Sequence, residues 1–201
     1  MSKSKLPQRA SLEYLRKLAK DRLKELRRED PETKLADAQL AVARDHGFKS
    51  WRALKSEVEK RQEKKLARFF EACVKGDVDT LRVLIAKDPS LIRTFSAHGA
   101  QYIRSGLHAA AAAGHADVVR LLLDAGEDPS RYNPDGYHAH STPLHQAVWS
   151  DHADVVRLLV ERGARLDIQD TVYHGTPLGW AIHGGRTAIA EYLRNRGAPT
   201  T

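Results

Sequence analysis

Cysteine and long apolar runs are nearly absent from this 201-residue chain. Its single cysteine, Cys73, excludes an intrachain disulfide framework. No apolar run approaches the roughly 20 residues that a membrane-spanning helix needs. The N-terminus also lacks a basic start followed by an apolar run and a small-residue cleavage site. We therefore expect a chain that enters no membrane and works in the reducing cytoplasm.

The charge of the chain is unevenly distributed. The formal net charge is +7, yet residues 1–65 hold 19 Lys and Arg against 11 Asp and Glu, and the remainder holds 14 against 15. A basic surface of this kind favours nucleic acid or another polyanion. Acidic residues are interspersed, however, and no long block of Lys and Arg occurs, which is typical of an ordinary solvated helical surface.

The strongest pattern is an internal repeat. The stretch GLHAAAAAGHADVVRLLLDAG, from Gly106, matches PLHQAVWSDHADVVRLLVERG, from Pro143, at an offset of 37. A third copy, PLGWAIHGGRTAIAEYLRNRG, begins at Pro177, and a diverged first copy, ARFFEACVKGDVDTLRVLIAKD, begins at Ala67. Apolar residues make up 41% of the chain, which is sufficient for a core. Four units of this period predict a solenoid.

Each unit is predicted to form a helix, a tight turn and a second helix. Thr142 and Thr176 are placed to cap the first helix of their units. Pro143 and Pro177 then take its first position, where the missing N–H costs nothing. The second helix is apolar on most faces, as in an element packed between neighbouring units. Glycines that can adopt a left-handed conformation then end it, at Gly126, Gly163 and Gly197.

These motifs resemble ankyrin repeats: TPLHQAV from Thr142, TPLGWA from Thr176, GHADVVRLLLDAG from Gly114 and DHADVVRLLVERGA from Asp151. The resemblance covers about residues 66–201. It implies an all-α repeat solenoid of about four ankyrin repeats, with L-shaped helix pairs stacked side by side and β-hairpin fingers at one edge of a concave face. It also implies a non-enzymatic role in binding a protein partner.

The sequence departs from the family pattern in three places. Gly179 stands where the motif has histidine, Ser105 and Gly106 replace Thr-Pro, and the first unit lacks the opening motif. His108 and His145 fall at the motif histidine, whose imidazole is expected to satisfy local backbone and hydroxyl groups. Both are therefore excluded from any binding site.

The chain is expected to divide into three parts: a flexible basic tail, 1–10; an N-terminal helical unit, 11–64; and an ankyrin repeat domain, 65–201, with repeats at about 65–104, 105–141, 142–175 and 176–201. In the helical unit, Ser11 caps a first helix that reaches about residue 28. A second helix runs from Leu35 to Gly47, and a third begins after Ser50, with Phe48 and Trp51 as apolar anchors.

The stretch LADAQLAVARDHGFKSW resembles a short helical segment found ahead of ankyrin repeats in bacterial proteins, so a bacterial origin is expected. The N-terminal helical unit can also cover the apolar side of the first repeat, as the end of a solenoid requires. Gly47 and Phe48 between two helices also permit a helix-turn-helix interpretation. Nucleic-acid binding through the basic N-terminal unit is therefore the alternative function, although Glu57 and Glu59 interrupt the basic face of the following helix.

Two of the expected fingers are longer than the third. From Gly126 to Leu144 is 18 residues and from Asp88 to Leu107 is 19, whereas Gly163 to Leu178 is 15. Loops tolerate insertions and also carry function more often than scaffold elements do. Together with the inner helices, the fingers are predicted to bind the partner through Tyr102, Arg104, Tyr132, His138, His140, Trp149, His174, Trp180 and His183.

The finger histidines also permit a chemical role. His138, His140 and His174 could form a three-histidine metal or small-ligand site. No second-shell carboxylate, HExxH motif or paired cysteine supports it. Ser141 beside His140 resembles a hydrolase dyad, but no nucleophile elbow accompanies it. We therefore expect no catalytic residue, no metal and no cofactor.

Overall fold

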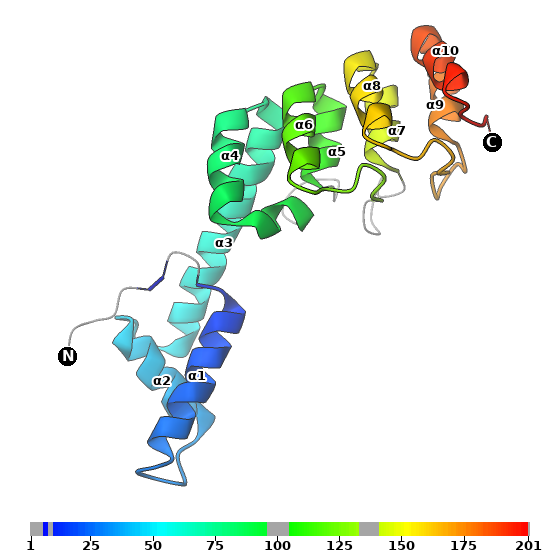
Figure 1. The fold of residues 1–201 in the computed structure, drawn as a ribbon. Helices are drawn as coiled ribbons and strands as arrows, with labels where there is room; N and C mark the ends of the chain where they lie inside the picture. Colours follow the sequence, from blue (N-terminus) through cyan, green and yellow to red (C-terminus); the bar gives the residue numbers. More distant parts are fainter. Residues whose placement is uncertain (1–5, 8–9, 96–104, 133–140, 201) are drawn as a thin grey trace. The chain divides into compact units, whose positions relative to one another are not determined.

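The computed structural model describes residues 6–7, 10–95, 105–132 and 141–200. The chain divides into two compact units, residues 1–65 and 66–201. Within the described residues every regular element is helical (Figure 1). None of the helices there is both long and apolar enough to cross a membrane.

The first unit contains the three helices expected from the sequence: α1 (Leu12–Leu26), α2 (Leu35–Asp45) and the first part of α3 (Trp51–Lys75). The Ser11 hydroxyl accepts a hydrogen bond from the N–H of Tyr14 at 3.0 Å, and the Ser50 hydroxyl accepts one from the N–H of Ala53 at 3.2 Å. Both predicted caps are thus confirmed. The resemblance of this unit to bacterial segments stays a prediction.

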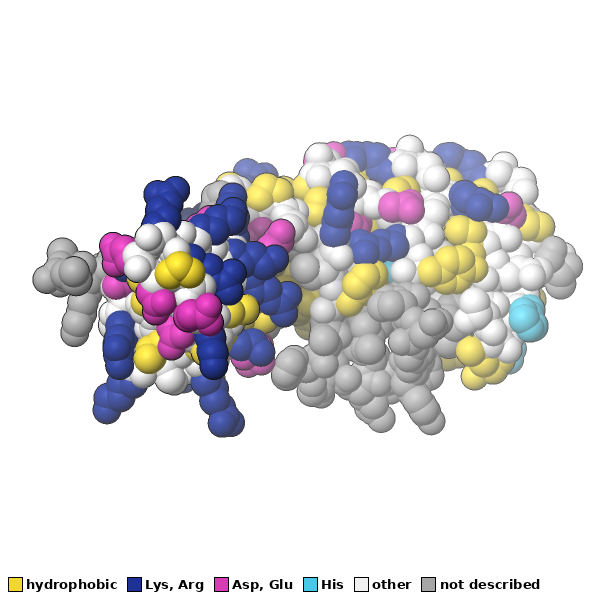
Figure 2. All heavy atoms as spheres, turned by 90° about the horizontal axis from the view of Figure 1, so that it is seen from below, with side chains coloured by type: hydrophobic (Ala, Val, Ile, Leu, Met, Phe, Trp, Pro, Cys, Tyr) yellow, Lys and Arg dark blue, Asp and Glu magenta, His cyan; other side chains and the backbone are white. Residues whose placement is uncertain are grey.

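The core of the first unit is formed by six buried residues, Leu6, Leu15, Val42, Ala43, Leu54 and Val58. Phe48 and Trp51, the predicted anchors, pack against it. Outside this core, Lys and Arg side chains are mixed with Asp and Glu on the face shown in Figure 2. The basic surplus of residues 1–65 therefore does not form an uninterrupted basic patch on this face.

The second unit is a series of helix pairs stacked side by side in chain order (Figure 1). The end of α3 pairs with α4 (Val78–Lys87), which the 3₁₀ helix η1 (Pro89–Arg93) follows; then come α5 (Gly106–Ala113) with α6 (Ala116–Asp124), α7 (Pro143–Trp149) with α8 (Ala153–Glu161), and α9 (Pro177–His183) with α10 (Thr187–Asn195). The expected all-α repeat solenoid is confirmed.

The helix boundaries follow the predicted signals. Thr176 accepts a hydrogen bond from the N–H of Gly179 at 3.1 Å, and proline opens α7 and α9. Gly126, Gly163 and Gly197 have φ of 92°, 84° and 80° after the second helices. The local sequence is therefore sufficient to place both ends of these helices.

Gly106 is explained by the packing of the first two helix pairs. A Cβ atom at this position would lie 2.9 Å from Cε1 of Phe69 and 3.0 Å from Sγ of Cys73. There is no room for the proline that opens α7 and α9. Burial raises the pKa of the Cys73 thiol to about 12, so this cysteine is a packed, protonated group.

The predicted β-hairpin fingers stay a prediction. Their interiors, residues 96–104 and 133–140, lie outside the described residues. In the described part of the chain, β pairing is confined to one isolated antiparallel bridge between Phe95 and Ser105, at the base of the first finger.

Gly179, the departure from the motif histidine, lies beneath the end of the chain. The Thr176 hydroxyl donates a hydrogen bond to the carbonyl of Pro199 at 2.8 Å, and the carbonyl oxygen of Thr200 would lie 3.2 Å from a Cβ on Gly179. In the second and third helix pairs, the motif histidine instead bonds to the carbonyl just before the cap of the next inner helix. Residues 199–200 thus lie close to the space that the imidazole takes in those pairs.

Candidate partner-binding surface

The inner helices of the second unit carry a row of equivalent positions near their C-terminal ends. The row consists of Val74, Ala112, Trp149 and His183. Val74 and Trp149 are 51% and 49% exposed, although both are large and apolar. Exposed apolar side chains at equivalent positions of the first and third repeats are a candidate contact surface.

Trp149, Trp180 and His183 form one aromatic cluster on α7 and α9. The ring centroids of Trp149 and Trp180 lie 5.8 Å apart in an edge-to-face arrangement. Trp149 and His183 have nearly parallel rings with centroids 6.5 Å apart. The structure therefore brings together three of the nine predicted binding residues. Trp180 also contacts His145 edge-to-face at 5.0 Å, which ties the cluster to the scaffold.

Asp170 holds Trp180 in place. This carboxylate is almost fully buried and accepts hydrogen bonds from the backbone N–H groups of Val172, Tyr173 and Gly175 and from Nε1 of Trp180 at 2.9 Å. Burial acts to raise the pKa of Asp170, but the hydrogen bonds outweigh it and leave the pKa below its usual value. Asp170 is thus an ionised group that fixes the orientation of the Trp180 ring.

The loop around Asp170 also contains His174. This residue is exposed and has φ of 53°, in the left-handed region. Of the predicted binding residues, Tyr102, Arg104, His138 and His140 lie outside the described residues. The three-histidine site of His138, His140 and His174 therefore falls partly outside them as well. Among the described residues no group of three potential metal ligands is close enough to hold an ion.

Tyr132, the remaining predicted residue, is 37% exposed at the base of the second finger. Its hydroxyl donates a hydrogen bond to the carbonyl of Gln169 in the next repeat. Burial raises the pKa of this phenol, and the charge of Asp170 adds to the increase. The ring edge can meet a partner, while the hydroxyl is used within the protein.

His108 and His145 have the structural role that the sequence predicts. Both are fully buried, and Nδ1 of each ring contacts the hydroxyl of the helix cap, Ser105 or Thr142, at 2.8 Å. Their Nε2 atoms donate to the carbonyls of Ser141 and Gly175, the residues just before the cap of the next inner helix, each at 3.0 Å. The second contact was not predicted, because it depends on how the repeats stack.

A second set of contacts, also missed, links each repeat to the one before it. The residue preceding the second helix reaches back to the carbonyl of the exposed row: His115 to Val74 at 2.7 Å, His152 to Ala112 at 3.2 Å, and Arg186 to Trp149 at 3.0 Å. The recurrence of His115 and His152 at an offset of 37 was the available signal. These contacts fix the backbone beneath the candidate surface.

The fold and these inter-repeat contacts define a helical repeat protein whose inner helices present a half-exposed aromatic cluster. The model of the ankyrin repeat family (three copies) matches residues 69–170 and 135–201, which together make up most of the chain. The chain therefore belongs to the ankyrin repeat family, whose members generally mediate protein–protein interaction and are typically not enzymes.

Two similar proteins match only a part of this chain. A tRNA endonuclease of Homo sapiens, ANKZF1, is 46% identical over 65 residues, which is 31% of this chain and 9% of that protein. An E3 ubiquitin-protein ligase of Oryza sativa subsp. japonica, XB3, is 40% identical over 65 residues, 32% of this chain and 14% of that protein. The chain thus matches a small fraction of either relative.

Proposed function

We propose that this chain is a non-enzymatic, cytoplasmic interaction module that binds a protein partner. The binding surface consists of the concave face of four ankyrin repeats, the first of them diverged, and of two long hairpin fingers. The cluster of Trp149, Trp180 and His183 carries the proposal. Aromatic side chains that are half-exposed and already fixed by their neighbours contribute most to binding, because little conformational entropy is lost on association.

The chemistry of the surface favours a particular kind of partner segment. An apolar or aromatic side chain of the partner is expected to pack against Trp149, next to the small Ala112 in the same row. The fingers add Arg104, His138 and His140 from the sequence, so carboxylate groups in the partner are expected to face them. The proposal is thus a protein segment with an apolar anchor and acidic residues beside it.

The proposal does not include the endonuclease or ligase activity for which the two relatives are named. The match covers 9% of the endonuclease and 14% of the ligase. In the described part of the chain, the Cys73 thiol is packed and protonated, so it is not a ready nucleophile.

The test uses peptides selected on the wild-type chain from a random display library, and proteins captured from a native lysate. Trp149→Ala and Trp180→Ala are each expected to weaken the selected peptides about tenfold or more in fluorescence anisotropy, since central aromatic residues dominate binding energy. Joint replacement of Tyr132, His138, Trp149 and Trp180 by alanine should abolish capture, measured by quantitative mass spectrometry.

Val83→Ala is the matched control, because Val83 is an equally exposed apolar residue (51%) on α4, outside the inner row. It should leave affinity unchanged. The proposal is wrong if the tryptophan variants, shown to be folded by circular dichroism, bind the selected peptides as tightly as the Val83 variant does.

A further inference from the structure

Three consecutive residues at the base of the second finger each bond to a neighbouring repeat. The Ser130 hydroxyl accepts a hydrogen bond from the N–H of Arg165 at 2.9 Å. Nη2 of Arg131 donates to the carbonyl of Arg93 at 3.1 Å, and the Tyr132 hydroxyl donates to the carbonyl of Gln169. Residues 130–132 therefore connect the repeat before them with the repeat after them.

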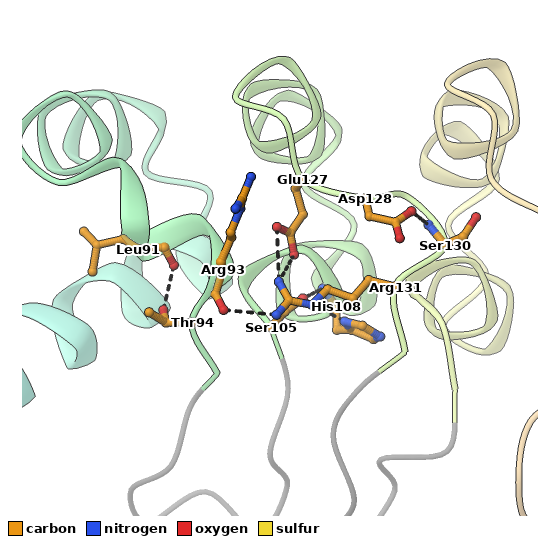
Figure 3. A network of polar contacts seen from close by, with 9 residues as sticks. All are labelled: Leu91, Arg93, Thr94, Ser105, His108, Glu127, Asp128, Ser130 and Arg131. Atoms are coloured by element: carbon orange, nitrogen blue, oxygen red, sulfur yellow. Dashed lines mark hydrogen bonds and ion pairs between the residues drawn. The ribbon is translucent and has the colours of Figure 1, made fainter.

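Figure 3 shows Arg131 bonded to both Glu127 and the carbonyl of Arg93. Its Nη1 atom donates to Oε1 of Glu127 at 3.1 Å, and Glu127 is 5% exposed. Its guanidinium carbon lies 4.2 Å from the centroid of the Phe95 ring. One side chain thus binds a buried carboxylate, a backbone carbonyl and an aromatic face. A planar guanidinium can make all three contacts at once, whereas an ammonium group cannot.

The contacts of Arg131 fall on the base of the first finger. Arg93 and Phe95 are the residues from which the chain enters that finger, and Phe95 pairs with Ser105, where the chain leaves it. Ser105 also caps α5 and contacts His108. Through Phe95, Arg131 is linked to both ends of the first finger while it belongs to the second.

The backbone around Arg131 is itself held. The N–H of Arg131 donates to the carbonyl of Asp128 at 3.2 Å, and the N–H of Ser130 donates to the Asp128 carboxylate at 2.8 Å. This turn starts beside Glu127, at the end of α6. Arg131 is therefore anchored to its own repeat and can transmit a constraint to the neighbouring one.

We propose that Arg131 is a positioning residue that couples the bases of the two long fingers, with Ser130 and Tyr132 extending the link to Arg165 and Gln169 in the loop after α8. The inference rests on the proposed function, because it explains how separate fingers are presented to a partner as one surface. Arg131 need not touch the partner. Its effect is to set the spacing between the residues that do.

The first experiment needs no partner. Residue-resolved amide hydrogen exchange is measured by NMR on the full chain carrying Arg131→Lys, with Arg120→Lys, an exposed arginine on α6, as the matched control. Exchange at Phe95 and Ser105 is expected to increase about tenfold in the Arg131 variant, with α5 to α8 unchanged. Unchanged exchange at Phe95 and Ser105, or an equal increase throughout the helices, would overturn the proposal.

Reciprocity gives a second test, because coupling between two sites acts equally in both directions. Phe95→Leu removes the ring beneath Arg131 and should increase exchange at the amide of Arg131, whereas Tyr132→Phe should affect Gln169 and leave Phe95 as it is. If Phe95→Leu leaves the Arg131 amide unchanged, the two finger bases are not coupled.

A binding readout separates this inference from the proposed function. Peptides selected on the wild-type chain should dissociate several-fold faster from Arg131→Lys than from Arg120→Lys. If the exchange result holds and the tryptophan variants bind as well as wild type, the coupling stands and the proposed binding surface fails. If the tryptophan variants lose binding and exchange at the finger bases does not change, the surface stands and the coupling fails.

Discussion

Gly114 shows how a single residue controls the contact between two repeats. Its φ is 77°, and a Cβ atom there would lie 2.6 Å from the His152 ring, which bonds to Ala112. Gly114→Ala is expected to lower the free energy of unfolding by about 1–2 kcal/mol for the left-handed conformation and by about 1 kcal/mol more for the lost hydrogen bond. Urea denaturation measures the loss.

Gly163→Ala is the matched control for that prediction. Gly163 has φ of 84°, but a Cβ atom there would meet nothing within 4 Å. Only the conformational cost should appear. Equal losses in the two variants would contradict the role assigned to the His152 ring.

After the third inner helix, α7, a different pair of residues makes the equivalent contact between repeats. Asp151, at the position of Gly114, has φ of 63° and a carboxylate 3.7 Å from Nη1 of Arg186. Arg186 takes the place of His152 and donates to the carbonyl of Trp149. The Gly114–His152 pair and the Asp151–Arg186 pair thus make equivalent contacts between repeats, so the residue types at these two positions depend on each other.

The lowered pKa of Asp170 predicts that the stability of the protein depends on pH. Because its folded-state pKa is below the ordinary value, its contribution to stability is present above the unfolded value of about 3.9 and is lost as the pH falls through the folded value. Asp170→Asn should therefore be less stable than wild type at pH 7, and the difference should shrink between pH 5 and the most acid conditions tolerated. Urea midpoints across this range test it, with the exposed Asp79→Asn as control.

A constant difference between wild type and Asp170→Asn at all pH values would contradict the assignment. Near-ultraviolet circular dichroism adds a direct readout of ring position. The signal of Trp180 should change in Asp170→Asn and remain in Asp79→Asn, since Trp180 donates to the Asp170 carboxylate.

At the scale of elements, the terminal helix pair differs from the others because residues 199–200 cover α9. A Cβ at position 179 would lie 3.2 Å from the carbonyl oxygen of Thr200, so Gly179→His requires this carbonyl to shift and should be costly in the full chain. After deletion of residues 199–201 the same substitution should cost less, because the space is open. A double-mutant cycle on urea unfolding should give a coupling of about 1 kcal/mol or more. Additive effects would show that residues 199–200 do not occupy the histidine position.

The helices could be predicted from the sequence, and the contacts between loops could not. Caps such as Ser11 and Thr176 and the apolar spacing of each helix are local signals, so they need no knowledge of the stack. Arg131 bonds to a carbonyl 38 residues away, so its role depends on where the neighbouring repeat places backbone atoms. Asp170 bonds to N–H groups two to five residues away, but its contact with Trp180 depends on how the loop folds against α9. No short pattern encodes these longer-range contacts.

For the candidate site, the positions of the residues could be predicted from the sequence, whereas their bonds could not. Trp149, Trp180 and His183 follow from the repeat alignment, because equivalent positions of stacked repeats lie next to each other. Tyr132 was identified by type and position, yet the bond of its hydroxyl to Gln169 was not. Sequence periodicity therefore locates the surface, and the loop geometry decides which polar atoms are free to meet a partner.

At the scale of the molecule, charge placement bears on the alternative of nucleic-acid binding. In the first unit, basic side chains lie beside carboxylates one helical turn away: Arg22 with Glu25 at 2.8 Å, Lys24 with Asp21 at 3.9 Å, Lys55 with Glu59 at 3.5 Å and Arg61 with Glu57 at 2.7 Å. A cation with a carboxylate partner gains less from a phosphate, because it must give up or share that partner.

We therefore expect the full chain to bind a duplex of about 30 base pairs weakly, with a slope of log affinity against log salt no steeper than about −3. Joint substitution of Glu57→Gln and Glu59→Gln frees Lys55 and Arg61, so the slope should steepen by about 2, whereas Glu161→Gln in α8 should have no effect. Fluorescence anisotropy over a salt series measures both slopes. Tight binding by the wild type near physiological salt, with a slope far steeper than this, would instead make the basic N-terminal unit a nucleic-acid-binding surface.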